Sequence, residues 1–422
     1  MSNQNITTLG AVADIITGPF GSMLHQSDYT PTGTPVIMPQ DIGNRTLNKS
    51  AIAYVGNKDA ERLSRYRVQE NDIVYARRGD VEKHAFIDKC DSGALCGTGC
   101  MRVRVDRSKA EPLYISFYLN RPESKRWISQ HAVGSNMPNL NTQILSEVPL
   151  ELPPLVEQAK AVEVLNYIDS KIRINAYICT ELETVAKTLY DYWFMQFDFP
   201  DENGYPYRTS GGEMVWNAQL KREIPKGWKA GTVGQLGDVV SGGTPTTTYE
   251  DYYCNQGIAW ITPNDLSGNE NKMFISHGDR DITQSGLDNS SAVLMPKHSV
   301  LLSTRAPIGY LAISNNEICT NQGFKSIVPN AGYHEYFIYY LLKRNVSAIA
   351  QQGVGTTFKE VSKDTLSNFA VPLPSKILAN NFAEKVTPLC EKRCVLEEEN
   401  RELERLRDWL LPMLMNGQAR VE

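Results

Sequence analysis

The chain has 422 residues, of which 41% are hydrophobic and 22% charged, and a formal net charge of -5. Its length predicts two or three domains, its charge argues against a simple basic nucleic-acid-binding protein, and no apolar run approaches the roughly 18 residues of a membrane span. The first ten residues carry no export signal, so we expect a cytoplasmic protein whose eight cysteines are free thiols.

The chain repeats itself at offsets of 221 to 227 residues. LSEVPLELP at 145–153 matches LSNFAVPLP at 366–374, and the aligned segments place Arg78 against Arg305. Each copy consists of short β-branched and aromatic segments between Gly, Pro, Asn and Asp, which is typical of a mostly β domain with long loops. One helix is also expected in each copy, so the sequence predicts two tandem α+β copies.

A long helix is predicted after each copy. Apolar residues follow in steps of three and four over 154–195 and again over 375–415, where Ser375 can act as the N-cap. At 1.5 Å per residue, each helix would be roughly 60 Å long. Because the two stripes occupy matching places in the repeat, we predict an antiparallel coiled coil and an internal pseudo-twofold axis.

These elements predict the domain organisation and the contact between the helices. The expected segments are 1–153 (first copy), 154–195 (first helix), 196–230 (linker), 231–374 (second copy), 375–415 (second helix) and 416–422 (tail). The predicted helix-pair core consists of Leu165, Ile168, Ile172, Leu182, Leu189, Val386, Leu389, Leu396, Leu403 and Leu410. Polar residues interrupt the stripes at Asn175, Arg393 and Asn400.

Two similar domains held at a fixed separation suit a DNA duplex with two half-sites. Side chains that can reach base edges and phosphates occur at matching places in the loops of both copies. The predicted DNA-binding residues are Ser22, Gln40, Asn44, Arg45, Arg77, Arg78, Lys83, Ser135, Asn136, Thr244, Asn264, Thr304, Arg305, Tyr310, Thr356, Thr357 and Lys359. The alternative is a pseudo-dimeric interaction scaffold or repressor-like protein, whose copies recognise something other than DNA.

The sequence does not favour an enzyme. Asp265, Glu270 and Lys272 imitate a metal-dependent nuclease signature, but their spacing is tight and the matching first-copy segment keeps only Asp41. A methyltransferase would need a glycine-rich cofactor loop and an aromatic-proline tetrad, and neither is present. We therefore expect no catalytic residue and no metal site.

The chain resembles the specificity subunits of type I restriction-modification systems. The resemblance covers essentially the whole chain and rests on GPFGS (18–22), LPPLVEQ (152–158), LYDYWFMQFDFP (189–200), REIPKGW (222–228) and SGGTP (241–245). It implies a non-catalytic component of a phage-defence complex, with two target recognition domains that each recognise one part of a bipartite DNA sequence. It also implies that the helices set the gap between these parts and dock two methyltransferase subunits, followed by translocase-nuclease subunits.

The resemblance further implies that S-adenosylmethionine, ATP and Mg are bound by partner subunits, and that this chain has no cofactor of its own. Family members diverge most in their recognition domains, so base-contacting residues are not carried over from relatives. The IPKGW segment that leads into the second copy has no counterpart before the first copy.

Overall fold

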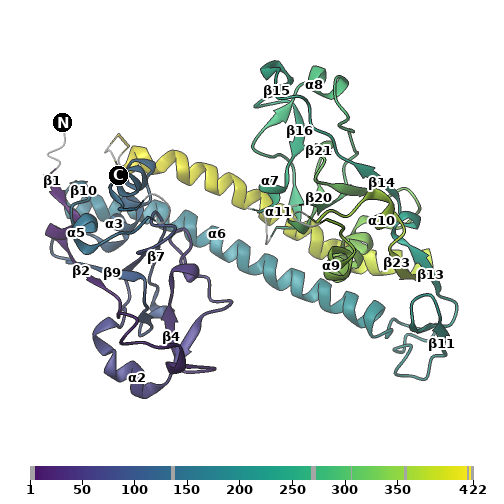
Figure 1. Ribbon diagram of the computed structural model, residues 1–422, viewed down its shortest axis with the longest axis horizontal. Helices are drawn as coiled ribbons and strands as arrows, with labels where there is room; N and C mark the ends of the chain where they lie inside the picture. Colours follow the sequence, from purple (N-terminus) through teal and green to yellow (C-terminus); the bar gives the residue numbers. More distant parts are fainter. Residues whose placement is uncertain are drawn as a thin grey trace. The chain divides into compact units, whose positions relative to one another are not determined.

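The structure, a computed structural model, describes residues 5–134, 138–267, 272–305, 307–355, 359–415 and 418–419. The chain divides into two compact units, residues 1–172 with 402–422 and residues 173–401 (Figure 1). Each unit contains one copy of the repeat and a part of each long helix. Across the described ranges, no helix has the length and hydropathy needed to cross a membrane.

The described residues of the first copy form three small sheets. They are β1 (Asn5–Thr8) with β10 (Pro149–Leu152); β2 (Ala13–Thr17), β9 (Cys100–Val105), β6 (Ile73–Ala76) and β7 (His84–Phe86), in this order; and β3 (Tyr29–Thr30), β5 (Ala53–Val55), β4 (Thr34–Ile37) and β8 (Leu95–Cys96), in this order. All these pairs are antiparallel except β4 with β8.

The second copy repeats this topology sheet by sheet. Its sheets are β13 (Lys229–Thr232) with β23 (Ala370–Leu373); β14 (Asp238–Ser241), β22 (Lys325–Val328), β19 (Val300–Thr304), β20 (Ile308–Ser314) and β17 (Phe274–Ile275); and β15 (Tyr253–Cys254), β18 (Asp281–Ile282), β16 (Ile258–Ile261) and β21 (Ile318–Thr320). The parallel pair recurs as β16 with β21. The expected duplicated α+β fold is therefore confirmed, with β17 as an additional edge strand.

One glycine in each copy allows a close backbone approach. A Cβ atom on Gly18 would overlap the carbonyl oxygen of Gly97, and a Cβ atom on Gly242 would overlap that of Asn321. Only glycine lets the chain leave β2 or β14 against these loops. The matching GPFGS and SGGTP segments therefore have the same structural role in the two copies.

The helices differ between the copies in one respect. The second copy has the single expected helix, α9 (Glu335–Gln351), but the first has α3 (Pro112–Leu119) and α4 (Pro122–His131). Pro122 cannot continue α3, because its nitrogen has no proton to donate, and it begins a new helix instead. The shorter helices are α1 (Leu9–Val12), α2 (Asn57–Arg62), α5 (Thr142–Ser146), α7 (Pro263–Ser267), α8 (Gln284–Asp288) and α10 (Lys363–Ser367).

The repeated LSEVPLELP and LSNFAVPLP segments join each copy to a long helix. Each contains the end of a short helix (α5 or α10), then a strand (β10 or β23), and then leads into α6 (Leu155–Tyr190) or α11 (Lys376–Met415). A π-helical turn, Asp191–Met195, continues α6. The expected N-cap is confirmed, since the Ser375 hydroxyl accepts a hydrogen bond from the Leu378 amide at 3.2 Å.

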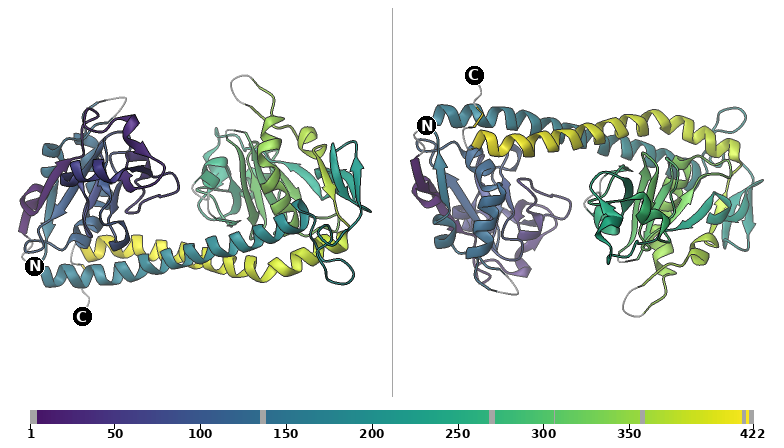
Figure 2. Two further views of the ribbon diagram at one scale, coloured as in Figure 1. Left: turned by 90° about the horizontal axis from the view of Figure 1, so that it is seen from below. Right: turned by 90° about the horizontal axis from the view of Figure 1, so that it is seen from above.

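The two long helices pair in an antiparallel manner within each unit (Figure 2). In residues 173–401, Asn175 of α6 bonds to Asn400 of α11, and the ring centroids of Tyr190 and Phe382 lie 5.6 Å apart. Residue numbers along α11 therefore decrease as those along α6 increase. In the other unit, Asp169 of α6 pairs with Arg407 of α11 at 3.3 Å. The expected helix pair is therefore present, with apolar contacts and buried polar pairs in the same seam.

The segment 196–230 forms a hairpin, β11 (Met214–Asn217) with β12 (Arg222–Pro225). Phe197 and Phe199 are buried, and the Trp228 ring centroid lies 5.4 Å and 5.6 Å from theirs. Aromatic side chains bury large apolar areas, so this segment is firmly packed in its unit.

Candidate nucleic-acid interface

The two copies present one arginine each in an equivalent setting. Arg78 follows β6 and forms a β-bridge with Asn139, and Arg305 follows β19 and forms one with Glu360. Both side chains are exposed, and neither has an ion-pair partner within the described part of the chain. The alignment of these arginines in the repeat thus corresponds to a common position at the end of a core strand.

The segment beside each arginine is also held in the same way. In the first copy, Val133 and Asn139 exchange backbone hydrogen bonds at 3.0 and 2.9 Å, and in the second Val354 and Glu360 do so at 3.0 Å. The predicted residues Ser135, Asn136, Thr356 and Thr357 belong to these segments and lie outside the described residues.

A polar cluster lies close to Arg305 in the second copy. The Thr244 hydroxyl bonds to the Gln322 side chain, and Lys325 Nζ is 3.3 Å from the Gln322 carbonyl oxygen and 3.5 Å from a Glu360 carboxylate oxygen. Lys325 is only 7% exposed, which is unusual for an ammonium group. Sequence reasoning missed Gln322 and Lys325, although a lysine at the start of the short strand KSIV, next to Phe324, was a usable signal.

Two predicted DNA-binding residues are corrected by the structure. The Arg45 guanidinium pairs with Asp169 of α6, donates to Ser116 Oγ at 3.0 Å and lies 3.4 Å from the Phe117 ring centroid. Thr304 is fully buried, and its hydroxyl donates to the Gly323 carbonyl oxygen at 3.3 Å. Both polar groups are used inside the fold, so neither is available to DNA on this surface.

The other predicted residues differ in accessibility. Arg77 is half-buried and donates to the Leu140 carbonyl oxygen at 3.1 Å, whereas exposed Lys83 pairs with Asp80 at 2.7 Å. Asn44 is exposed and accepts from Lys125 at 3.3 Å. The remaining exposed side chains are Ser22, Gln40, Asn264 and Lys359, and Thr244 and Tyr310 are half-buried.

His84 on β7 is packed between Ser116 and Tyr75. Its Nε2 atom lies 3.1 Å from the Ser116 carbonyl oxygen, and its ring centroid is 5.0 Å from that of Tyr75. Burial, together with the nearby charges of Arg45 and Lys125, lowers the pKa of His84 to about 3. His84 is therefore a neutral structural residue of the first copy.

Replacing His84 by glutamine is expected to remove one acid-sensitive contribution to stability. The unfolded chain binds a proton at this histidine below about pH 6.5, but the folded chain does so only near pH 3. The contribution of His84 to the free energy of unfolding is therefore fully present above the pKa that this histidine has in the unfolded chain. It is lost as the pH falls from there toward the pKa in the folded chain, with a slope approaching about 1.4 kcal/mol per pH unit. Unfolding of the wild type and His84→Gln, compared from neutral to acidic pH, measures this; identical pH profiles would contradict it.

All ten predicted helix-pair core residues lie on α6 or α11. Leu165, Ile168, Val386 and Leu396 are buried, and Ile172, Leu182, Leu189, Leu389, Leu403 and Leu410 are partly buried. Two of the three polar interruptions pair with each other, because Asn175 donates to Asn400 at 2.9 Å, and it also donates to Glu399 at 2.7 Å. A buried asparagine pair favours a single register of two helices.

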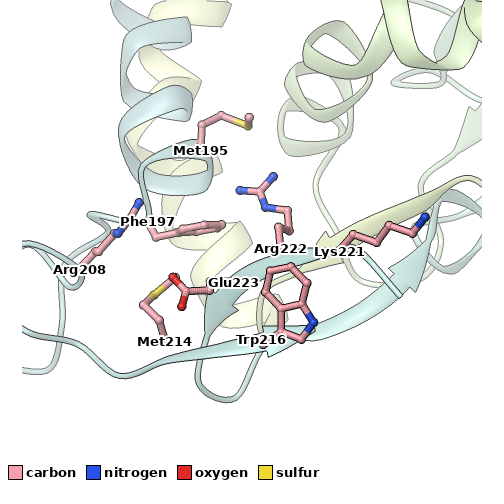
Figure 3. A pocket seen from close by; sticks show the side chains of 8 residues that line it. All are labelled: Met195, Phe197, Arg208, Met214, Trp216, Lys221, Arg222 and Glu223. Atoms are coloured by element: carbon pink, nitrogen blue, oxygen red, sulfur yellow. The ribbon is translucent and has the colours of Figure 1, made fainter. Parts of the chain in front are cut away.

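An open pocket lies beside the β11–β12 hairpin (Figure 3). Its lining residues are Met195, Phe197, Arg208, Met214, Trp216, Lys221, Arg222 and Glu223. Three of them are cationic, Trp216 is 64% exposed, and the Arg222 guanidinium carbon is 4.9 Å from the Phe197 ring centroid. This lining suits an anionic group beside an apolar one, and these eight side chains include no histidine, serine or cysteine.

Asp265, the first residue of the nuclease-like pattern, stabilises a loop. Its carboxylate accepts from the Thr262 amide at 2.6 Å and the Asp279 amide at 2.8 Å. Asp41 accepts from the Met38 amide at 2.8 Å in the same part of the first copy. Glu270 lies outside the described residues, and among those described there is no cluster of three His, Cys, Asp or Glu suited to a metal.

A duplicated α+β fold joined to paired long helices defines the class of this protein. Residues 1–184 and 225–404 match the family model described as type I restriction modification DNA specificity domain. The chain therefore belongs to this family, whose members are non-catalytic specificity components of their complexes.

Three similar proteins agree with this assignment. The type I restriction enzyme MjaIX specificity subunit of Methanocaldococcus jannaschii is 37% identical over 166 residues, which is 38% of each chain. The type I restriction enzyme HindI specificity subunit of Haemophilus influenzae is 22% identical over 439 residues, covering 91% of this chain and 94% of the relative. The crystal structure of a type I restriction-modification S subunit from M. genitalium has the same fold, with a TM-score of 0.59, 14% identity, and 98% and 96% of the two chains covered.

Proposed function

We propose that this chain is the DNA sequence-specificity subunit of a type I restriction-modification complex in the cytoplasm, and that each copy recognises one half of a bipartite target. The observation that supports this most strongly is the equivalent, exposed placement of Arg78 and Arg305 on two copies of one fold. Arginine is the commonest residue in specific contacts to base edges, and loops on a rigid scaffold suit such contacts. We assign residues 1–153 and 231–374 as the recognition domains.

We further propose that 154–195 and 375–415 form the spacer that sets the gap and docks two methyltransferase subunits, with 196–230 as a linker and 416–422 as a tail. Several large apolar side chains on these helices are exposed, including Ile174, Tyr177 and Trp409. Exposed apolar groups on a helix favour packing against helices of a partner. Translocase-nuclease subunits would join this complex, and S-adenosylmethionine, ATP and Mg would bind to the partner subunits.

Exchange of one recognition domain tests this proposal. If residues 1–153 are replaced by the equivalent residues of another family member, we expect one half of the methylated motif to change and the other half to stay the same. The measurement is a genome-wide map of methylated sites in cells that carry this gene and its partner genes. A change in both halves would contradict independent recognition, and the absence of any motif that depends on this gene would favour a scaffold or repressor-like protein.

A further inference from the structure

A buried group of charged side chains joins the second copy to both long helices. Glu183 of α6 pairs with Arg393 of α11, and Arg393 Nε donates to Glu397 at 2.6 Å. Arg393 and Glu397 are 4% and 3% exposed. Burial alone would lower the pKa of Arg393, but Glu397 and Glu183 raise it above its ordinary value, so the guanidinium remains charged.

Glu397 and Glu183 also reach two different elements of the second copy. The Glu397 carboxylate accepts from the Met273 amide at 2.9 and 3.0 Å and from the Phe274 amide at 2.9 Å, where β17 begins. Glu183 accepts from Lys343 Nζ at 2.5 Å and from the Tyr340 hydroxyl at 3.1 Å, both on α9. The second copy is therefore attached to the long helices at two separate elements, β17 and α9. Each attachment opposes rotation of the copy about the other.

The first copy has a comparable connection at the same sheet edge. Arg45 forms a parallel β-bridge with Ala85 of β7, in the place that β17 takes beside β20. Its guanidinium pairs with Asp169 of α6, which also pairs with Arg407 of α11. In each copy, therefore, the edge next to the long helices is held by a helix carboxylate that also pairs with an arginine of α11.

The way each copy is attached to the long helices affects how precisely the protein can distinguish DNA gaps of different length. One additional base pair moves a half-site by about 3.4 Å along the duplex and, at 10 to 10.5 base pairs per turn, turns it by roughly 35°. Helices of constant length can exclude a wrong gap only if each recognition domain is held on them against sliding and rotation. Apolar contacts are non-directional, whereas hydrogen-bonded charged groups have a defined geometry.

We propose that Glu397 and Glu183 are positioning residues that determine how strictly the length of the DNA gap is recognised, separately from the identity of the bases. This inference rests on the proposed function of the chain. It assigns gap stringency to the anchors of the second recognition domain, in addition to the length of the helices.

The test uses the purified methyltransferase complex and duplexes that carry the same two half-sites with the native gap or with one base pair more or fewer. For Glu397→Gln, we expect the ratio of methylation rates between native and altered gaps to fall about tenfold, because the anchor loses its charge and one of its two acceptor oxygens. Preference for the bases within each half-site should stay the same. The matched control is Glu402→Gln, since Glu402 is 61% exposed on α11 and forms its ion pair with Arg405 on the same helix; its ratio should equal that of the wild type.

A second variant covers the case in which Glu397→Gln fails to assemble. Lys343→Met removes one of the two contacts between α9 and Glu183, at a side chain that is 38% exposed, and it should lower the same ratio by a smaller factor. Unchanged ratios in the assembled variants, or an equal fall in Glu402→Gln, would overturn the inference. If the wild-type complex methylates no bipartite duplex, the proposed function itself fails, which is a different result from correct methylation with unchanged gap stringency.

Discussion

Inserting seven residues into α6 after Ile172, and seven into α11 after Arg401, is expected to lengthen the gap in the methylated target by about three base pairs. Seven helical residues add about 10 Å, and a base pair occupies about 3.4 Å of the duplex. A complete heptad keeps the apolar stripe of each helix in phase, so the helices can still pair.

The insertion points are chosen to leave both acid–arginine pairs intact. Asp169 and Glu183 are 14 residues apart on α6, as are Arg393 and Arg407 on α11, and both insertions fall between the pairs. An insertion in only one helix should shift the two pairs relative to each other and impair assembly. The motif is mapped from methylated genomic DNA, and an unchanged gap in the doubly extended protein would mean that the helices do not set it.

Replacing Arg305 by alanine is expected to reduce methylation of the cognate duplex by roughly ten- to a hundredfold and to relax base preference in one half-site only. This is the range expected when one good contact to a base edge is lost. Arg78→Ala should have the same effect on the other half-site, because the two arginines occupy equivalent positions. The measurement is the initial methylation rate on duplexes that carry single-base changes in either half.

A control arginine separates base recognition from loss of surface charge. Arg405 is 67% exposed on α11 and pairs with Glu402, so Arg405→Ala should leave base preference unchanged in both halves. If Arg305→Ala lowered the rate equally for all duplexes, its role would be a phosphate contact. If it had no effect, Arg305 would lie outside the DNA-contacting surface.

The sequence alone was sufficient for the duplicated architecture. The paired LSEVPLELP and LSNFAVPLP segments predicted where each copy passes into a long helix, and the structure has a strand and then a helix at both places. Such features depend on local periodicity, turn residues and capping, which are visible in neighbouring positions of the chain. The additional first-copy helix α4, which begins at Pro122, was open to the same reasoning but was missed.

The partners of polar side chains were decided only by the tertiary structure. Arg45 was predicted to contact DNA because it lies in a polar loop, but Asp169, 124 residues further along the chain, binds it inside the first unit. Arg393 and Asn400 interrupt the apolar stripe of α11, and the fold brings Glu183 and Asn175 to them. A sequence pattern indicates which positions are buried, whereas the group that satisfies a buried charge comes from a distant segment. The helices and the repeat were therefore determined by the sequence itself, and the way in which each copy is held on those helices was determined by the packed structure.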